Sequence, residues 1–363
     1  MAGSVFGKHF KISTWGESHG KALGVVIDGV PAGLPLCEED IQIFLNRRKP
    51  GQSKFTTARA EGDLVEILSG VFEGKTTGTP ISLMVKNADQ HSKDYSNIMD
   101  KFRPGHADYG FFEKYGFRDY RGGGRSSGRE TIGRVAAGAV AARILSEMGI
   151  SICTYTKSVG PVSIQSFDKD EIAKNSLYMP DEKAAVEAQA FLEECIKNQD
   201  SAGGVVECIV EGVPAGVGEP VFDKLDAKLA QAIMSIGAVK GFEMGDGFLA
   251  SGSKGSQNND AFEIINDKVA KKTNHSGGVL GGMSDGAPIV FRAAFKPTPS
   301  ISQVQDTVNE AGENVSIEIH GRHDPIIVPR AVVVVESMAA ITILDAMMDN
   351  MTSRIDYLKE FYS

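Results

Sequence analysis

The chain has 363 residues, of which 42% are apolar and 23% charged, so it can bury a substantial core as one large domain or two average ones. Its formal net charge of -9 excludes non-specific nucleic-acid binders, whose surfaces are basic. The four cysteines form neither a CxxC pair nor a metal-ligand spacing, so we expect reduced thiols and no structural metal.

The apolar segments do not predict a signal peptide or a membrane anchor. Residues 1–11 lack an apolar core. The longest apolar stretch, 331–344, is interrupted by Glu336 and is too short to cross a bilayer. We therefore expect a cytoplasmic protein that does not engage membranes.

Three similar segments occur in the same order in both halves of the chain. A strand-like run ending in GVPAG and followed by an amphipathic helix spans 23–46 and again 206–236. A turn of the form GxxxGxPI leads into a strand-like run at 74–81 and at 282–289. An arginine loop precedes a long Ala/Val-rich helix at 125–145 and at 322–344. Three collinear matches favour an internal duplication.

The duplication predicts the fold class. We expect an α+β protein, a single pseudo-symmetric β-α-β sandwich in which helices pack against antiparallel or mixed sheets. One domain would cover 1–363, with repeat halves at approximately 1–150 and 202–350 and a charged, partly helical surface insertion at 153–201. A site between the halves would draw its loops from distant parts of the sequence.

In chain order, the first candidate site segments are two turns. GESHG at 16–20 places His19 among small residues after a strand-like run at 10–15, and a solvated surface turn explains it as well as a site does. RRKPGQSK at 47–54 puts four cations around a Pro-Gly turn after a predicted helix. These cations either complement the helix dipole or bind an anion.

RPGHAD at 103–108 holds Arg103 and His106 three residues apart across a rigid Pro-Gly. Histidine changes charge near neutral pH, so His106 is suited to proton transfer to a leaving group or a reduced cofactor. The alternative is a histidine packed in a turn.

RGGGRSSGRET at 121–131 is the strongest local signal for a phosphate site. Its glycines let the backbone approach a ligand, its serines supply hydroxyls, and its arginines offer forked donors. A helix beginning at about residue 130 would add its N-terminal dipole. The pattern is neither a P-loop nor a dinucleotide fingerprint.

The second half adds NHSGGVLGG at 274–282, the stiff loop KPTPS at 296–300, and GRHDP at 321–325, where arginine, histidine and a carboxylate are adjacent. The sequence shows no triad spacing for acyl transfer and no HExxH pattern. We therefore expect neither a covalent serine nor a metal site.

Together these segments resemble the chorismate synthase family from residue 7 to residue 344. The resemblance is carried, in order, by GESHG, RRKPGQS, FRPGHADY, GGGRSSGRETIGRVAAGA, GEPVFDKLDA, GSQN, NHSGGVLGG, KPTPSI and GRHDP. It implies anti-1,4-elimination of phosphate and a proton from 5-enolpyruvylshikimate 3-phosphate, which gives chorismate. It further implies a need for reduced FMN that is not consumed overall, and a homotetramer.

The resemblance also implies roles for individual residues. His106 would protonate the departing phosphate or assist at the flavin, His19 would stabilise anionic reduced flavin, and Asp324 would help to take the proton. The substrate arginines would be Arg48, Arg103 and Arg129. The implied FMN-binding residues are Arg125, Ser126, Ser127, Ala238, Gly281, Lys296, Pro297, Thr298, Pro299, Ser300 and Arg322.

Three positions depart from the family pattern: Lys54 stands where arginine is usual, Gly237 where asparagine is common, and Gly128 where alanine is usual. Lys54 weakens any claim for a bidentate contact, and Gly237 leaves only a backbone contact to FMN. NADPH would enter only as a flavin reductant, and the compact chain favours an external source of reduced FMN. The rival interpretation is a phosphosugar or nucleotide transferase that uses the same arginines without flavin.

Overall fold

The computed structural model describes residues 3–51, 55, 62–87, 99–120, 123–319 and 324–363. The first of two five-stranded sheets in this part of the chain is antiparallel throughout. Its strands alternate buried and exposed residues, as expected for a sheet with one face in the core. In spatial order they are β1 (Val5–Phe6), β2 (Lys11–Gly16), β3 (Ala22–Asp28), β7 (Ile81–Lys86) and β4 (Val65–Ser69).

The second five-stranded sheet is also antiparallel. Its strands in spatial order are β11 (Val239–Met244), β16 (Ile289–Phe295), β10 (Gly204–Glu211), β8 (Ser151–Val159) and β9 (Val162–Ser163). The observed sheets and helices confirm the predicted α+β class.

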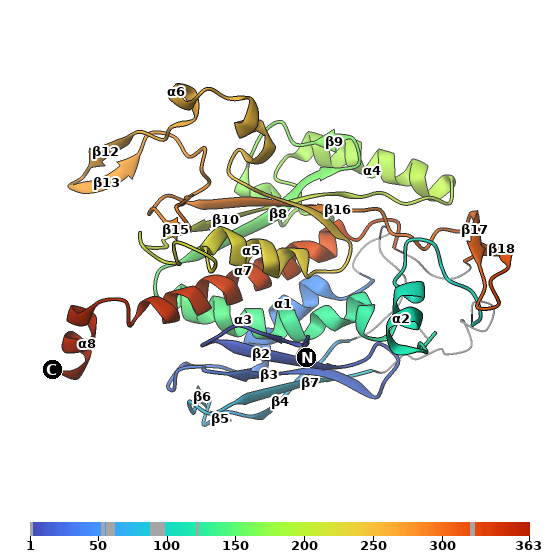
Figure 1. Ribbon diagram of the computed structural model, residues 1–363, viewed down its shortest axis with the longest axis horizontal. Helices are drawn as coiled ribbons and strands as arrows, with labels where there is room; N and C mark the ends of the chain where they lie inside the picture. Colours follow the sequence, from blue (N-terminus) through green and yellow to red (C-terminus); the bar gives the residue numbers. More distant parts are fainter. Residues whose placement is uncertain (1–2, 52–54, 56–61, 88–98, 121–122, 320–323) are drawn as a thin grey trace.

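Helices lie between the two sheets (Figure 1). They are α1 (Glu38–Arg48), α3 (Thr131–Glu147), α5 (Leu225–Met234) and α7 (Val328–Asn350). Helix α3 packs on β3 of the first sheet, and α7 packs on β8 and β10 of the second. By length and composition α7 alone among the described helices could cross a membrane, but 89% of its most apolar window is buried, as in the core helix of a soluble protein. It is also longer than the 331–344 stretch expected from the sequence.

Helices α3 and α7 approach closely at Gly138. A Cβ atom at this position would lie 2.2 Å from the Cβ of Ser337, which is fully buried on α7. Since the neighbouring atoms include the Ser337 backbone, they cannot move aside without separating the helices.

We therefore expect Gly138→Ala to lower the free energy of unfolding by about 1–3 kcal/mol, the usual cost of overpacking a core. Gly110→Ala is a matched control, because Gly110 is also helical but a methyl group there would meet no described atom within 4 Å beyond its own helix. The control should be neutral or up to about 1 kcal/mol more stable, since alanine favours helix. Urea titration of both variants measures the difference, and equal stabilities would contradict the close approach.

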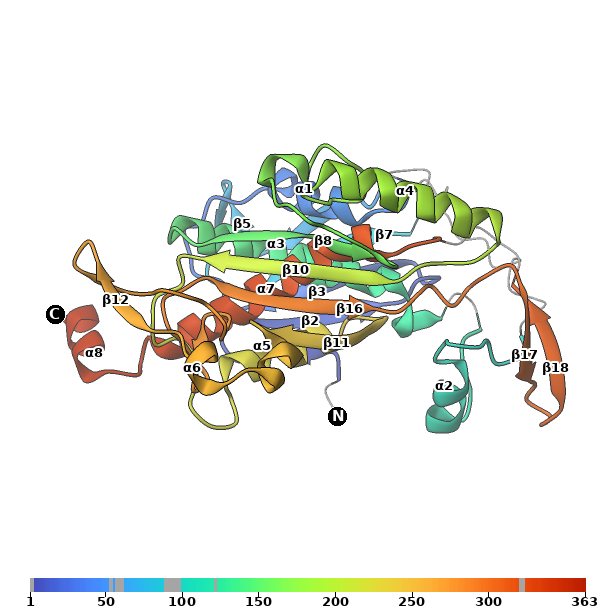
Figure 2. The ribbon, with the colours of Figure 1, turned by 90° about the horizontal axis from the view of Figure 1, so that it is seen from above.

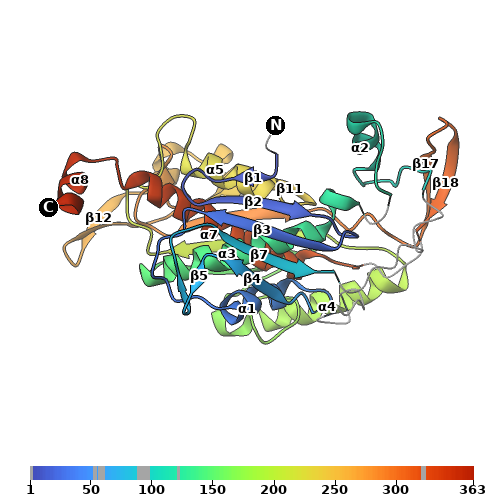
Figure 3. The same ribbon diagram turned by 90° about the horizontal axis from the view of Figure 1, so that it is seen from below.

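The remaining elements lie outside the two sheets. Helix α4 (Glu182–Lys197) lies along the β9 edge of the second sheet (Figure 2), while none of the described helices overlies the first sheet when it is viewed from below (Figure 3). Helix α2 (Asp108–Tyr115) and hairpin β17–β18 (Val304–Val308, Asn314–Glu318) lie at one end of the molecule. The smaller elements are β5 (Val71–Phe72), β6 (Lys75–Thr76), α6 (Gly255–Asn258), β12 (Phe262–Ile265), β13 (Lys268–Lys271), β14 (Val279–Leu280), β15 (Met283–Ser284) and α8 (Ile355–Tyr362).

The two GVPAG turns have the same local structure. In the first, the Thr76 hydroxyl donates to the carbonyl of Pro31 at 2.6 Å; in the second, the Ser284 hydroxyl donates to the carbonyl of Pro214 at 2.6 Å. The glycines that open and close each turn have positive φ, which glycine adopts at no steric cost. The strand order β2-β3-β7-β4 also corresponds to β8-β10-β16-β11, with each set connected in the same sequence.

The expected surface insertion at 153–201 is wrong in its first part. Residues 151–159 form β8, which pairs with β10 inside the second sheet, and Thr156 is fully buried. The charged residues of the later segment obscured this strand in the sequence. In the second sheet, strand β8 occupies the place that β2 has in the first sheet.

Candidate active site

The RPGH turn and the KPTPS loop meet although about 190 residues separate them. Lys296 Nζ donates to the carbonyl of Gly105 at 2.5 Å, and Ser300 Oγ lies 2.9 Å from His106 Nε2. Gly105 has φ +69°, and a Cβ there would be 2.7 Å from Pro299 Cβ. The glycine is therefore required both for the turn and for the close approach of the two loops.

The environment of His106 defines its protonation. Burial, Arg103 and Lys296 hold the pKa of His106 down at about 4, so the ring is neutral at pH 7. The carbonyl of Pro104, 3.0 Å from Nδ1, can only accept, which assigns the proton to Nδ1. Nε2 therefore accepts the Ser300 hydroxyl. In this state His106 offers a base at Nε2, whereas the sequence suggested an acid.

The turn at Ala238 joins the same group of loops. Ala238 has φ +71°, a left-handed conformation unusual for a residue with a side chain, and its carbonyl accepts the backbone N–H of Lys296 at 3.0 Å. At the neighbouring Gly237, a Cβ would point into space free of described atoms to a distance of 4 Å. On the far side of the KPTPS loop, the Ser201 hydroxyl donates to the carbonyl of Thr298 at 2.7 Å.

A second group of charged residues is buried between α1 and α3. Arg48, 1% exposed, lies 2.5 Å from a carboxylate oxygen of Asp63, and Arg129 lies 3.2 Å from the other oxygen. Arg129 also donates to the Asn87 side-chain oxygen at 2.8 and 3.1 Å. Burial lowers the pKa of Arg48, with a further contribution from nearby Arg330, while Asp63 opposes both effects. Two substrate arginines expected from the sequence thus lie together on one buried carboxylate.

Asp324 extends this arginine group. Its carboxylate forms a 2.5 Å ion pair with Arg330, whose Nε donates to the carbonyl of Arg48 at 3.0 Å. Asp63, Asn87 and Arg330 were not among the site residues expected from the sequence. Only Arg330 carried a signal, since it occupies the position in the third repeated segment that Arg134 has in the first half.

Arg103, the third expected substrate arginine, is held by a carboxylate of its own. Its guanidinium donates to both oxygens of Asp108, at 2.8 and 2.9 Å. Although burial acts in the opposite direction, these bonds keep the pKa of Asp108 below its ordinary value. Arg118, at 3.6 Å from Asp108, reinforces the pair. Arg103 therefore acts on His106 mainly through its charge.

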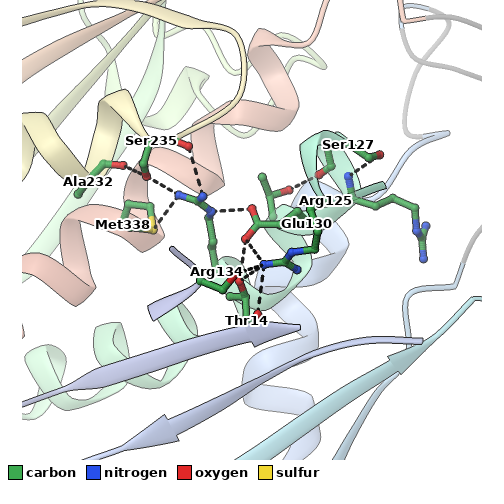
Figure 4. Close-up of polar contacts among 12 residues, drawn as sticks. Thr14, Arg125, Ser127, Glu130, Arg134, Ala232, Ser235 and Met338 are labelled. Carbon is green, nitrogen blue, oxygen red and sulfur yellow. Dashed lines mark hydrogen bonds and ion pairs between the residues drawn. The ribbon is translucent and has the colours of Figure 1, made fainter. Parts of the chain in front are cut away.

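The arginine–serine loop is folded against the first sheet (Figure 4). Arg125 donates to Thr14 Oγ1 at 2.7 Å and to the carbonyl of Gly16 at 3.0 Å. The Ser126 hydroxyl donates to the carbonyl of Gly123 at 2.7 Å, and Ser127 Oγ accepts from the backbone N–H of Arg129 at 3.3 Å. These side chains are thus hydrogen-bonded within the protein. The space beside the backbone differs: a Cβ atom added at Gly124 or Gly128 would have no atom of the described residues within 4 Å other than those of its chain neighbours.

The structure does not place the remaining expected site residues at these loops. His19 Nδ1 is 3.1 Å from the hydroxyl of its neighbour Ser18. Gly281 lies in the β14–β15 turn before β16, whereas Lys296 follows β16, so roughly 23 Å of strand separates them at about 3.3 Å per residue. Arg322, like Lys54, lies outside the described residues.

The residues present fit an anionic flavin in part. Lys296 and Arg103 supply positive charge beside His106, and the KPTPS loop and the Ala238 turn are already in contact. Within one chain, Gly281 lies away from the KPTPS loop and the Ala238 turn. In the part of the chain that the structure describes, no cluster of histidine, cysteine or carboxylate side chains could hold a metal ion.

The fold is that of an α+β protein, and its described residues form two groups of charged side chains, one around Asp63 and one beside His106. A family model described as chorismate synthase matches residues 10–348. A chorismate synthase from Agathobacter rectalis is 68% identical over 100% of this chain and 99% of its own length, and one from Methanocella arvoryzae is 57% identical over 96% and 95%.

A crystal structure of chorismate synthase superimposes with a TM-score of 0.78 at 32% identity and covers 98% of this chain and 97% of its own. The chain belongs to the chorismate synthase family and is therefore a lyase of that type. The rival interpretation, a flavin-independent phosphosugar or nucleotide transferase, finds no support in these comparisons.

Proposed function

We propose that this chain catalyses anti-1,4-elimination of phosphate and a proton from 5-enolpyruvylshikimate 3-phosphate, giving chorismate. The observation that carries the proposal is the meeting of the RPGH turn and the KPTPS loop around half-buried, neutral His106. A substrate with a phosphate and two carboxylates requires several cations, and Arg48, Arg129 and Arg330 form such a group.

We propose that reduced FMN is the cofactor. When bound, it supplies electron density as phosphate leaves and receives it back as the proton is lost. Among this chain's residues, Lys296 and the backbone of the Ala238 turn would hold the cofactor, with the loop at Arg125, Ser126 and Ser127 on the other side. Pro297, Thr298, Pro299, Ser300, Gly281 and Arg322 complete the proposed FMN-binding set, and NADPH would serve only as a flavin reductant.

The proposed proton transfers start from the observed protonation. A phosphate dianion near His106 would offset the charge of Arg103 and Lys296, and this raises the pKa of His106. Nε2 would then carry the proton that leaves with the phosphate. Asp324, oriented by its ion pair with Arg330, would help to take the substrate proton, and His19 would stabilise the negative charge of the reduced flavin.

Within one chain, Gly281 lies away from the RPGH turn, the KPTPS loop and the Ala238 turn. Gly281 and these loops can therefore contact one cofactor only if several copies of the chain form an oligomer. We therefore propose a homotetramer in the cytoplasm, in which a second copy supplies Gly281. We also propose that the fold is one pseudo-symmetric β-α-β domain that arose by duplication. The matching strand orders and the matching hydroxyl contacts at the two GVPAG turns support this origin.

We expect phosphate release from enolpyruvylshikimate phosphate only when reduced FMN is present, without net oxidation of the flavin. An anaerobic assay with and without dithionite-reduced FMN, followed by flavin absorbance, measures both. Equal turnover without flavin, or one flavin oxidised for each phosphate released, would contradict the proposed function.

A further inference from the structure

A chain of polar contacts connects the arginine–serine loop to helix α5 (Figure 4). Arg125 donates to Thr14 Oγ1 at 2.7 Å, and Thr14 Oγ1 in turn donates to Glu130 Oε1 at 2.9 Å. The other oxygen of Glu130 accepts from Arg134 Nε at 2.8 Å. Arg134 then donates from Nη1 to the hydroxyl of Ser235 at 2.5 Å and from Nη2 to its carbonyl at 3.3 Å.

The far end of this chain of contacts is next to the Ala238 turn. Ser235 caps the end of α5, and the left-handed residue Ala238 follows three positions later. The Ala238 carbonyl accepts from the backbone of Lys296. Arg134 therefore joins helix α3, which follows the arginine–serine loop, to the end of α5 beside the Ala238 turn, and that turn contacts the KPTPS loop. Arg134 and Ser235 are 101 residues apart in the sequence.

The Glu130–Arg134 ion pair is largely shielded from water, whereas the Ser235 end of the chain of contacts is exposed. The side chains of Glu130 and Arg134 are 11% and 17% exposed, so water screens them less than a surface pair. Glu130 also lies 3.7 Å from Arg125, which gives one carboxylate two guanidinium neighbours. An Arg fork that meets both the hydroxyl and the carbonyl of one residue fixes direction as well as distance.

We propose that Arg134 is a positioning residue: it holds the Arg125–Ser127 loop and the Ser235–Ala238 turn at the separation at which both contact one flavin. This rests on the proposed use of FMN. The ordinary alternative is an i,i+4 ion pair that only stabilises helix α3, in which case its removal would leave FMN binding unchanged.

The chain offers a matched control on the same helix. Arg143 forms an i,i+4 pair with Glu147 at 3.1 Å, but its side chain is 41% exposed, and it does not share the contacts that join Arg134 to Ser235. Arg134→Met and Arg143→Met therefore both remove one helical ion pair, and only the first also removes the contacts to Ser235.

The test measures oxidised FMN binding by fluorescence quenching and the visible circular dichroism of bound FMN in the full chain. We expect Arg134→Met to weaken FMN binding about tenfold and to alter the dichroism. Arg143→Met should have nearly the FMN affinity and dichroism of the unsubstituted chain. Arg134→Lys should recover little, because an ammonium cannot reproduce the fork. Ser235→Ala removes one of the two contacts and should weaken binding about threefold.

The outcomes separate the two proposals. If the unsubstituted chain binds neither oxidised nor dithionite-reduced FMN, the proposed cofactor is wrong and the positioning role is overturned with it. If the unsubstituted chain binds FMN but Arg134→Met matches Arg143→Met in affinity and dichroism, only the positioning role is overturned. Should Arg134→Met fail to fold, Ser235→Ala decides, and unchanged FMN affinity in that variant overturns the positioning role.

Discussion

Replacing His106 with alanine should lower the single-turnover rate by about 10²–10⁴-fold, the range typical for loss of a general acid or base. The affinities for FMN and substrate should change much less, because the neutral ring contributes no charge and the arginines supply most of the attraction. Rapid-quench measurement of phosphate release gives the rate, and equilibrium titration gives the affinities.

His9 provides the matched control for this substitution. It is a histidine outside the site whose ring contacts the carboxylate of Asp349, and its side chain is 44% exposed. His9→Ala should leave the single-turnover rate unchanged. If His106→Ala also turns over normally and only its thermal midpoint falls, His106 is a packing residue of the RPGH turn.

The protonation of His106 can be followed directly by NMR. Without ligands its pKa should be about 4, and binding of a phosphate-bearing ligand should raise it because negative charge favours the imidazolium. Without ligands, the His106 side chain binds more protons in the unfolded state than in the folded state between about pH 6.5 and 4. The stability contributed by the neutral ring is therefore fully present above pH 6.5 and is lost as pH falls through about 4.

Asp63→Asn should lower the free energy of unfolding by about 3–5 kcal/mol, since it leaves two buried guanidiniums without their shared carboxylate. The side chain of Asp63 is fully buried, and its Arg48 and Arg129 partners are 1% and 8% exposed. Among the described residues, Arg48 Nε already lacks a hydrogen-bond partner, so this arginine depends heavily on Asp63. Denaturant titration measures the effect.

Asp356→Asn is the corresponding control at the surface. Asp356 pairs with Arg354, but both side chains are more than half exposed, so water screens the pair and its loss should change the stability little. An equally small loss for Asp63→Asn would mean that water or another group compensates the buried arginines, and that Asp63 is not their main partner.

Several features of this protein could be predicted from the sequence because they depend on neighbouring residues. The positive φ of the glycines in both GVPAG turns follows from residue type and turn chemistry, and helix α1 was predicted nearly to its observed end. The order of the repeated segments also anticipated the matching strand connections. The family and its lyase activity were likewise evident, because several long motifs in series are specific in combination.

Only the tertiary structure decided which residues meet. Strand β8 belongs to the core because of its pairing with β10, about 50 residues away, and its local composition did not show this. Asp63 matters because Arg48 and Arg129 reach it from different helices, and Arg125 turns back to β2 because carbonyl and hydroxyl acceptors lie there. The lowered pKa of His106 likewise comes mainly from burial in the tertiary structure, then from nearby Arg103, with a smaller contribution from Lys296, which follows about 190 residues later. Backbone preferences act over a few residues, whereas burial and charge act through space, so the chain's own order could not reveal them.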